Sequence, residues 1–293
     1  MKSIAVPDRA TRDPRAAGRA RLGGDPRAAW HAARARAVRA LPALLFALGA
    51  LALWELYVDV AGVDQLVLPA PHAMLAQLWD NAGLLWQNFT VTAREVVLGL
   101  ALALLAGLLA AVAIHLSPLT RRAVYPHAVG SQAVPIAILA VPLCFWWGFG
   151  ILPKLLVISL ICFFPVLVTT VDGLARVDVE QLKLLRTLDA SRLQAFRFAE
   201  LPAAIPAAIS GARIALAVGV IGAFIAETST PTIGSYAGLG HQIASDLTAL
   251  QTARAYAATA VLFVFAIACF YSLTLIEHRI APWAHDHSKG DPS

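Results

Sequence analysis

The sequence predicts an all-α membrane protein of about six transmembrane helices, and three observations lead to that fold class. Hydrophobic residues make up 59% of the 293 residues and charged residues only 14%, whereas soluble domains carry about 25% charged residues. Six apolar blocks are long enough to cross a hydrocarbon core, which takes about 20 helical residues. Lys and Arg gather in alternate connections between these blocks, which is typical of a multi-pass protein.

The expected spans follow one another with polar connections between them. They cover residues 41–61, 91–115, 128–147, 152–171, 205–226 and 256–276. Before them, residues 1–40 are rich in Arg, Ala, Pro and Gly, and we expect a disordered basic tail near anionic headgroups. The transmembrane domain then covers residues 41–279, and residues 280–293 form a second polar tail.

The distribution of basic residues sets the orientation. The tail of residues 1–40 holds ten of the 23 Lys and Arg residues, and the segments assigned to the same side bring that side to 19. The opposite side holds only Arg254. Both termini are therefore expected in the cytoplasm. The net charge of +5 is a topology signal, because no folded basic face suited to nucleic acid is visible.

The connection after the first span should lie outside the membrane, where Pro69 and Pro71 limit helix propagation. A short helix over residues 72–80 is expected to lie along the surface. The third and fourth spans contain prolines, and broken helices are tolerated in a bilayer only beside protein or a water-filled path. Pro135 and Pro142 are therefore candidate pathway or gate residues.

Three further residues are candidates for the pathway or its gate. Trp146 and Trp147 end the third span, where they either line a pathway or form an aromatic belt at the interface. Glu227 ends the fifth span near the outer face, where an acid is either a gate residue or a solvated end of the span. The fifth span is rich in small residues, among them Gly211, Gly219 and Gly222, which allow close helix approach.

The longest polar interruption lies between the fourth and fifth spans, and we define this loop as residues 176–204. At 100° per residue its leucines fall on one side and its basic residues beside them, which predicts an amphipathic helical element. The apolar side comprises Leu182, Leu185, Leu188, Leu193 and Phe196, and the basic residues are Lys183, Arg186 and Arg197. A break is expected at residues 189–191, with Asp189 capping the second short helix. The loop closes with Leu201-Pro202.

This loop resembles the coupling loop of ABC-importer permeases, whose pattern is Glu-Ala-Ala, three residues, Gly, nine residues, an aliphatic, one residue and Leu-Pro. Here Lys183, Leu184 and Leu185 stand at the opening positions and Asp189 at the glycine, where it can adopt the turn at modest strain. Other stretches match the nitrate, sulfonate and taurine branch in family order. They are LPAP at 68–71, VPIAILAVP at 134–142, WGFG at 147–150, residues 201–215, Ala-Glu at 226–227 and Gly-Leu-Gly at 238–240.

The resemblance implies a type I ABC importer permease in a bacterial inner membrane, carrying a sulfonate-, taurine- or nitrate-like solute. It implies three partners: an ATPase subunit, a periplasmic or lipid-anchored binding protein, and a second permease copy, here an identical one. The coupling residues would be Lys183, Leu184, Leu185, Arg186, Asp189, Leu201 and Pro202. The sequence lacks a Gly-x-x-x-x-Gly-Lys-Ser/Thr phosphate loop, so the chain is not expected to be an enzyme, and ATP and Mg would bind the ATPase.

Two alternatives from other classes were weighed. An ion-coupled secondary transporter would need carboxylates or His relays at mid-span, and an intramembrane enzyme would need clustered nucleophiles or metal ligands. Neither pattern is apparent in the sequence. Cys144, Cys162 and Cys269 occur singly in apolar spans, which favours a packing role over metal or disulfide use.

Overall fold

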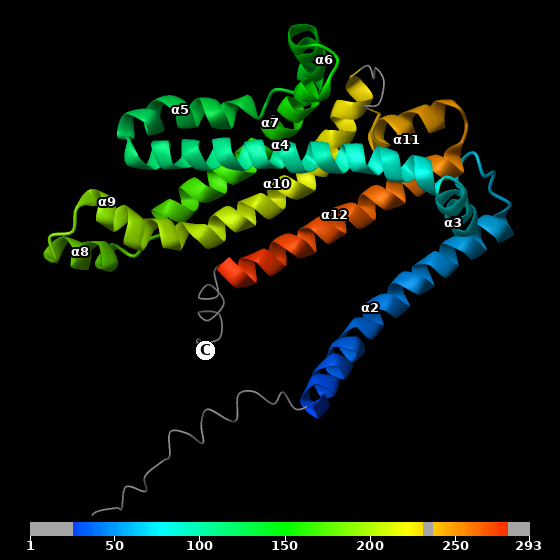
Figure 1. Ribbon diagram of the computed structural model, residues 1–293, viewed down its shortest axis with the longest axis horizontal. Coiled ribbons are helices and arrows are strands. Elements are labelled where there is room, and N and C mark those ends of the chain that lie inside the picture. The colour runs from blue at the N-terminus through cyan, green and yellow to red at the C-terminus, as the bar shows by residue number, and fades with distance from the viewer. Residues whose placement is uncertain (1–25, 231–236, 281–293) are drawn as a thin grey trace, which may run out of the picture. The chain divides into compact units, whose positions relative to one another are not determined.

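The computed structural model describes residues 26–230 and 237–280, and every regular element in these ranges is a helix (Figure 1). The all-α fold class is therefore confirmed. The chain divides into two compact units, Met1–Ala61 and Gly62–Ser293.

The first unit contains one long helix, α2, which covers Pro26–Ala61. Its part from Leu41 to Ala61 is a candidate membrane span of 21 residues, in agreement with the first expected span. Residues 1–25 of the expected tail lie outside the described residues, and the part from Pro26 onward is helical.

The second unit is built on four long helices (Figure 1). They are α4 (Ala82–Leu116), α7 (Ile151–Ala175), α10 (Leu201–Ser229) and α12 (Thr252–Ile280). The middle of α7 is buried against both α4 and α10, with Ile158, Cys162 and Val166 fully covered. The core of the unit therefore lies along α7.

Small residues allow α4 and α10 to approach α7 closely. A Cβ atom at Gly99 of α4 would lie 2.6 Å from Cγ2 of Ile158, and one at Gly222 of α10 would lie 2.9 Å from Cδ1 of Ile161. Such distances are far inside van der Waals contact, so only glycine fits at these crossings. The expectation that small residues of the fifth span allow close packing is confirmed for α10.

The expected third span, residues 128–147, is broken at Pro135, one of the prolines for which a broken helix was expected. The chain forms α5 (Pro118–Ser131) and α6 (Ile136–Trp147), separated by a break that ends at Pro135. Proline has no N–H for the helix ladder and disfavours helical geometry in the residue before it. With 12 residues, α6 is a shorter apolar helix, and the described residues hold five helices that are long and apolar enough to cross a membrane. The expected count of six spans stays a prediction.

Shorter helices lie at the two ends of this unit (Figure 1). At one end are α3 (Pro71–Asp80), which confirms the expected short helix, and α11 (Leu239–Thr248). At the other end are α8 (Val179–Thr187), α9 (Arg192–Ala195) and the π-helical turn η1 (Phe196–Glu200). We call these the α11 end and the α8 end.

Candidate functional site

Two short helices build the loop between α7 and α10. The side chain of Asp178 accepts a hydrogen bond from the N–H of Glu180 at the start of α8. At the start of α9, Ser191 and Gln194 form a capping box, with N–H to side-chain oxygen distances of 3.3 and 2.7 Å. These bonds satisfy N–H groups that a helix start leaves unpaired. The predicted position of the break is confirmed, but the predicted cap is wrong: Ser191, and not Asp189, caps the second helix.

Asp189 occupies the turn that ends α8, with a φ of +53°. Its N–H donates to the carbonyl of Arg186 at 3.1 Å, and the N–H of Ala190 donates to the carbonyl of Leu185 at 3.0 Å. This closure of a helix end usually employs glycine. Aspartate adopts the left-handed conformation more readily than most L-residues, and the predicted turn is therefore formed without a glycine.

The second helical element of the loop continues directly into α10. Leu201 and Pro202 form the first turn of α10, and Leu201 is partly exposed. Proline has no N–H to donate to the carbonyl four residues earlier, and the π-helical turn η1 lies immediately before it. The loop and the long helix are thus one continuous helical rod from Arg192 onward.

The outer surface of α8 is apolar with basic residues beside it. None of the nine α8 residues, all described, is buried, and Leu184 and Leu188 are 61% and 69% exposed. Lys183 and Arg186 are exposed on the same helix, whereas Leu185 is half-buried. We call Lys183, Leu184, Arg186 and Leu188 the α8 surface. Exposed leucines grouped with cationic side chains are typical of a protein-binding surface.

Polar contacts tie this loop to the end of α4. The Nε2 atom of His115 lies 2.8 Å from Oε2 of Glu200, and Nη2 of Arg192 donates to the carbonyl of Leu116 at 3.2 Å. The His115 ring also packs beside Phe196, with 6.3 Å between ring centroids. A displacement of α9 and η1 would therefore be transmitted to α4 as well as to α10. The sequence analysis missed this link, because the paired residues are far apart in sequence.

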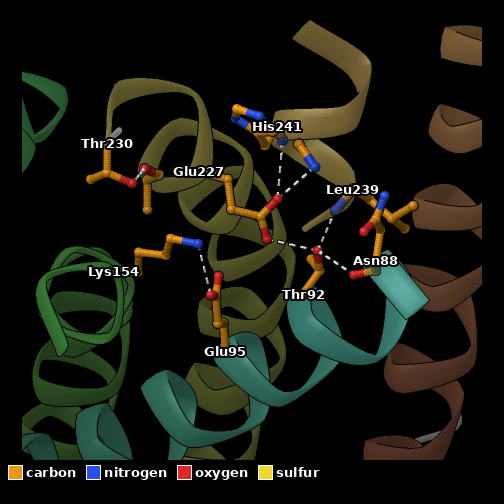
Figure 2. Close-up of polar contacts among 10 residues, drawn as sticks. Asn88, Thr92, Glu95, Lys154, Glu227, Thr230, Leu239 and His241 are labelled. Atoms are coloured by element: carbon orange, nitrogen blue, oxygen red, sulfur yellow. Dashed lines mark hydrogen bonds and ion pairs between the residues drawn. The ribbon is translucent and has the colours of Figure 1, made fainter. Parts of the chain in front are cut away.

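Glu227 lies at the α11 end, where it is fully buried (Figure 2). Its Oε1 accepts a hydrogen bond from the hydroxyl of Thr92 at 2.6 Å, and its Oε2 accepts from the N–H groups of Gly240 at 2.5 Å and His241 at 3.3 Å. The N–H of Leu239 donates to Thr92 at 2.8 Å. The carboxylate and the threonine thus satisfy the first N–H groups of α11, which have no partners inside the helix. Glu227 is therefore neither solvated nor exposed to a pathway in this conformation, and its predicted gate role stays a prediction.

The glycines around α11 make room for this carboxylate. A Cβ atom at Gly240 would lie 2.9 Å from Oε2 of Glu227, and one at Gly238 would overlap the carboxylate. The Ala-Glu stretch at 226–227 and the Gly-Leu-Gly stretch at 238–240 are therefore two halves of one structural unit.

A buried ion pair lies beside Glu227 (Figure 2). The Nζ atom of Lys154 in α7 lies 3.0 Å from Oε1 of Glu95 in α4, and the two side chains are 2% and 0% exposed. We call Thr92, Glu95, Lys154 and Glu227 the polar cluster. Sequence reasoning missed the pair, although a lone acid and a lone lysine inside apolar runs were the available signal. The sequence analysis found no pattern of carboxylates at mid-span, and the fully buried Glu95 in α4 corrects that reading.

A second set of polar contacts continues from the polar cluster along α11. Asn88 of α4 donates to Oε1 of Gln242 at 2.9 Å, and Gln242 donates to Oδ1 of Asp246 at 2.7 Å. The guanidinium of Arg254 in α12 holds the same buried carboxylate, with Nε 3.0 Å from both oxygens. Four helices, α4, α10, α11 and α12, are therefore joined by side-chain hydrogen bonds at the α11 end.

The remaining predicted site residues lie on α6 or directly before it. Trp146 and Trp147 are 71% and 51% exposed and contact each other edge to face. They line a groove of about 590 Å³ with apolar residues of α4 and α7. Pro142 lies inside α6, while Pro135 precedes it at the break. Their roles in a pathway stay predictions.

Neither site contains groups arranged for covalent chemistry or metal binding. Among the described residues, no group of three or more His, Cys, Asp and Glu side chains could hold a metal ion. Cys162 donates to the carbonyl of Ala215 at 3.1 Å inside the core. What the arrangement can do is hold helices together at the α11 end and offer a docking surface at the α8 end.

The chain is similar to transport permeases over most of its length. A "probable ABC transporter permease protein" of Haemophilus influenzae is 34% identical over 242 residues, which cover 83% of this chain and 97% of that protein. The formylaminopyrimidine transport permease protein of Halalkalibacterium halodurans is 30% identical over 85% of this chain and 98% of that protein. The taurine transport system permease protein of Escherichia coli is also 30% identical, with 80% and 86% covered.

A solved structure shares the fold. The crystal structure of an amino acid ABC transporter with histidines matches with a TM-score of 0.55 at 16% sequence identity, covering 69% of this chain and 96% of that one. The expected type I importer permease fold is therefore confirmed. At this identity the likeness concerns the fold alone.

A family model decides the assignment and argues against the ion-coupled alternative. Residues 103–283 match the model described as "Binding-protein-dependent transport system inner membrane component". That range includes α6, α7, the whole α8–α9 loop, α10 and α11. The chain belongs to this family, and it is a membrane-embedded permease component of an ABC transporter.

Proposed function

We propose that the chain forms the translocation pathway of an ATP-driven importer, in which two identical permease chains pair and each docks on one ATPase subunit. A periplasmic or lipid-anchored binding protein delivers the solute to the outer face. ATP and Mg bind the ATPase, so phosphoryl transfer takes place outside this chain. The α8 end and both termini face the cytoplasm, as the distribution of basic residues supports.

One observation carries the ATPase-docking part of this proposal: a structured loop presents uncovered leucines. Leu184 in α8 and Leu188, the residue that follows α8, are more than half exposed, and the helix begins and ends with defined caps. Leaving such side chains in water forgoes about 1.5–3 kcal/mol each, so a rigid element that does so is suited to a protein partner. Lys183 and Arg186 beside them favour a partner surface with acidic groups.

The contacts of the loop support a route for mechanical coupling. When the ATPases close, a force on α8 and α9 reaches α10 through the continuous helical rod, and it reaches α4 through Glu200 and Arg192. The break before Pro135 lets α6 move without bending a continuous helix. In this account the pathway changes between inward- and outward-facing states as α4 and α10 tilt.

The solute in our proposal is small and of the sulfonate, taurine or nitrate type. Relatives of the chain are named for taurine and, in Bacillus subtilis, for aliphatic sulfonates. Other relatives are named for formylaminopyrimidine and riboflavin. Uptake of labelled taurine and of a labelled pyrimidine by cells that express the complete transporter tests the choice. Uptake of the pyrimidine alone would contradict the sulfonate-type solute and leave the importer function intact.

Copurification with the ATPase tests the docking surface. We expect the triple variant Lys183→Ala, Leu184→Ala, Arg186→Ala to bind the ATPase at least about tenfold more weakly, because each 1.4 kcal/mol of lost binding energy is a factor of ten. The matched control is Leu75→Ala, since Leu75 in α3 is 65% exposed at the opposite end of the same unit. Full retention of the ATPase by a membrane-inserted triple variant would overturn the docking proposal.

A further inference from the structure

The Glu95 carboxyl group has one oxygen without a donor. Its Oε1 is bonded to Lys154, but no donor among the described residues reaches its Oε2, although the side chain is 0% exposed. A buried acceptor left without a donor destabilises the folded state, and more so when it is charged. Figure 2 shows the carboxyl group of Glu227, on the facing helix α10, next to that of Glu95.

Two ionised carboxylates cannot hydrogen-bond to each other, because both are acceptors only. The donors around Glu227 do not remove the difficulty, since Thr92, Gly240 and His241 all direct their donors to Glu227 and not to Glu95. A direct contact between the two carboxyl groups becomes favourable when one of them carries a proton, because that group can then donate a hydrogen bond to the other.

The charges of the surrounding helices lead to the same requirement. Among the described residues, the charged and titratable groups facing the site are Glu95 from α4, Lys154 from α7, Glu227 from α10 and Cys144 from α6, and α11 contributes His241 at its first turn. With both acids ionised, these two carboxylates outnumber the one ammonium, that of Lys154, which the described part of the chain places beside them. The N-terminus of α11 offsets only about half a charge, and an uncompensated buried charge is strongly destabilising.

We propose that the polar cluster is a proton-binding site. One proton is held on the carboxyl group of Glu95, whose O–H donates a hydrogen bond to the carboxylate of Glu227. The bound proton balances the cluster, with Lys154 as the cation and Glu227 as the anion. It also gives the second oxygen of Glu95 a partner. The four groups then hold the outer halves of α4, α7 and α10 and the start of α11 as one neutral, hydrogen-bonded junction. This site lies at the opposite end from the ATPase-docking surface and does not depend on that function.

Infrared spectroscopy of the full-length permease in lipid nanodiscs tests the proposal at neutral pH. A protonated carboxyl group has a C=O stretching band that is separate from the bands of ionised carboxylates, and labelling glutamate with carboxyl-¹³C shifts it. We expect the parent to show a shifted band that is lost in Glu95→Gln. The band should also be lost in Glu227→Gln, because removing that acid lets Glu95 ionise beside Lys154.

The matched control is Glu200→Gln at the α8 end, where the acid is partly exposed beside His115. This variant should keep the whole of the band that the two cluster variants lose. If one cluster variant fails to insert into membranes, the loss of the band can still be tested in the other. The isotope shift of the band is measured on the parent protein and requires no variant. Absence of a glutamate-derived band in the parent, or its persistence in Glu95→Gln or Glu227→Gln, would overturn the proposal.

Discussion

The two ends of the helical unit differ in which side chains are buried and which are exposed. At the α11 end, acids, a lysine and helix N–H groups are buried and paired with one another, with Glu95 and Glu227 0% exposed. At the α8 end, leucines and basic residues of α8 stay exposed, with Leu188 69% exposed. The buried polar groups of the α11 end are thus bonded within the unit, whereas the α8 surface is uncovered and suited to a partner.

This difference predicts that substitutions at the two ends affect different properties of the protein. Buried polar contacts at the α11 end fix the geometry of four helices, so substitutions there should act mainly on folding. Exposed side chains at the α8 end contribute little to the free energy of unfolding, so substitutions there should act mainly on association. The following variants test that division in order of expected effect.

Replacing Lys154 with methionine should have the largest effect. The substitution keeps much of the side-chain volume but leaves the carboxyl groups of Glu95 and Glu227 without their cation. Breaking a buried pair in this way costs about 3–5 kcal/mol. Denaturant unfolding in a defined detergent measures the loss, and Lys183→Met on the exposed α8 surface is the matched control, with an expected change within about 0.5 kcal/mol. Equal effects of the two variants would contradict the division between the ends.

Replacing Gly240 with alanine should have an intermediate effect. The new methyl group would lie 2.9 Å from Oε2 of Glu227 and 3.0 Å from the backbone of Phe224. Overpacking of this kind costs about 1–3 kcal/mol. The shift in unfolding midpoint can be compared with that of Gly83→Ala, where nothing lies within 4 Å of the added Cβ. A midpoint unchanged in Gly240→Ala would show that α11 is not held against Glu227.

Replacing Asp189 with glycine should have the smallest effect. Glycine removes the strain of a positive φ but adds freedom to the unfolded chain, so we expect a gain of less than about 1 kcal/mol. Ser191→Ala, which removes the cap of α9, should instead lose about 1 kcal/mol. If Asp189→Gly destabilised the protein as much as Ser191→Ala, the assignment of the cap to Ser191 would be wrong.

Local patterns carried the features that the sequence predicted correctly. The length of the apolar runs predicted the four long helices of the second unit and the span of α2. The small and short polar side chains at 189–191 predicted the break between α8 and α9. The closing Leu201-Pro202 marked the start of α10. Each of these depends on neighbouring residues, whose preferences can be read without knowing the tertiary structure.

The features that the sequence did not give depend on contacts between distant segments. Glu95 and Lys154 are far apart in sequence, and only the packing of α4 on α7 brings them together. The burial of Glu227 depends in the same way on the return of α11. The division between α5 and α6 has a local cause instead: the apolar run continues through Pro135, but the geometry of proline interrupts the helix there.

Hydrogen–deuterium exchange of the permease, with and without its ATPase, tests the central contrast most directly. We expect the amides of α8 and α9 to exchange more slowly when the ATPase is bound, because docking covers that surface. The first amides of α11, at Leu239, Gly240 and His241, should exchange slowly in both states, because they are bonded inside the unit. Unchanged exchange at α8 together with new protection at α11 would contradict the account, since it would place the partner at the α11 end.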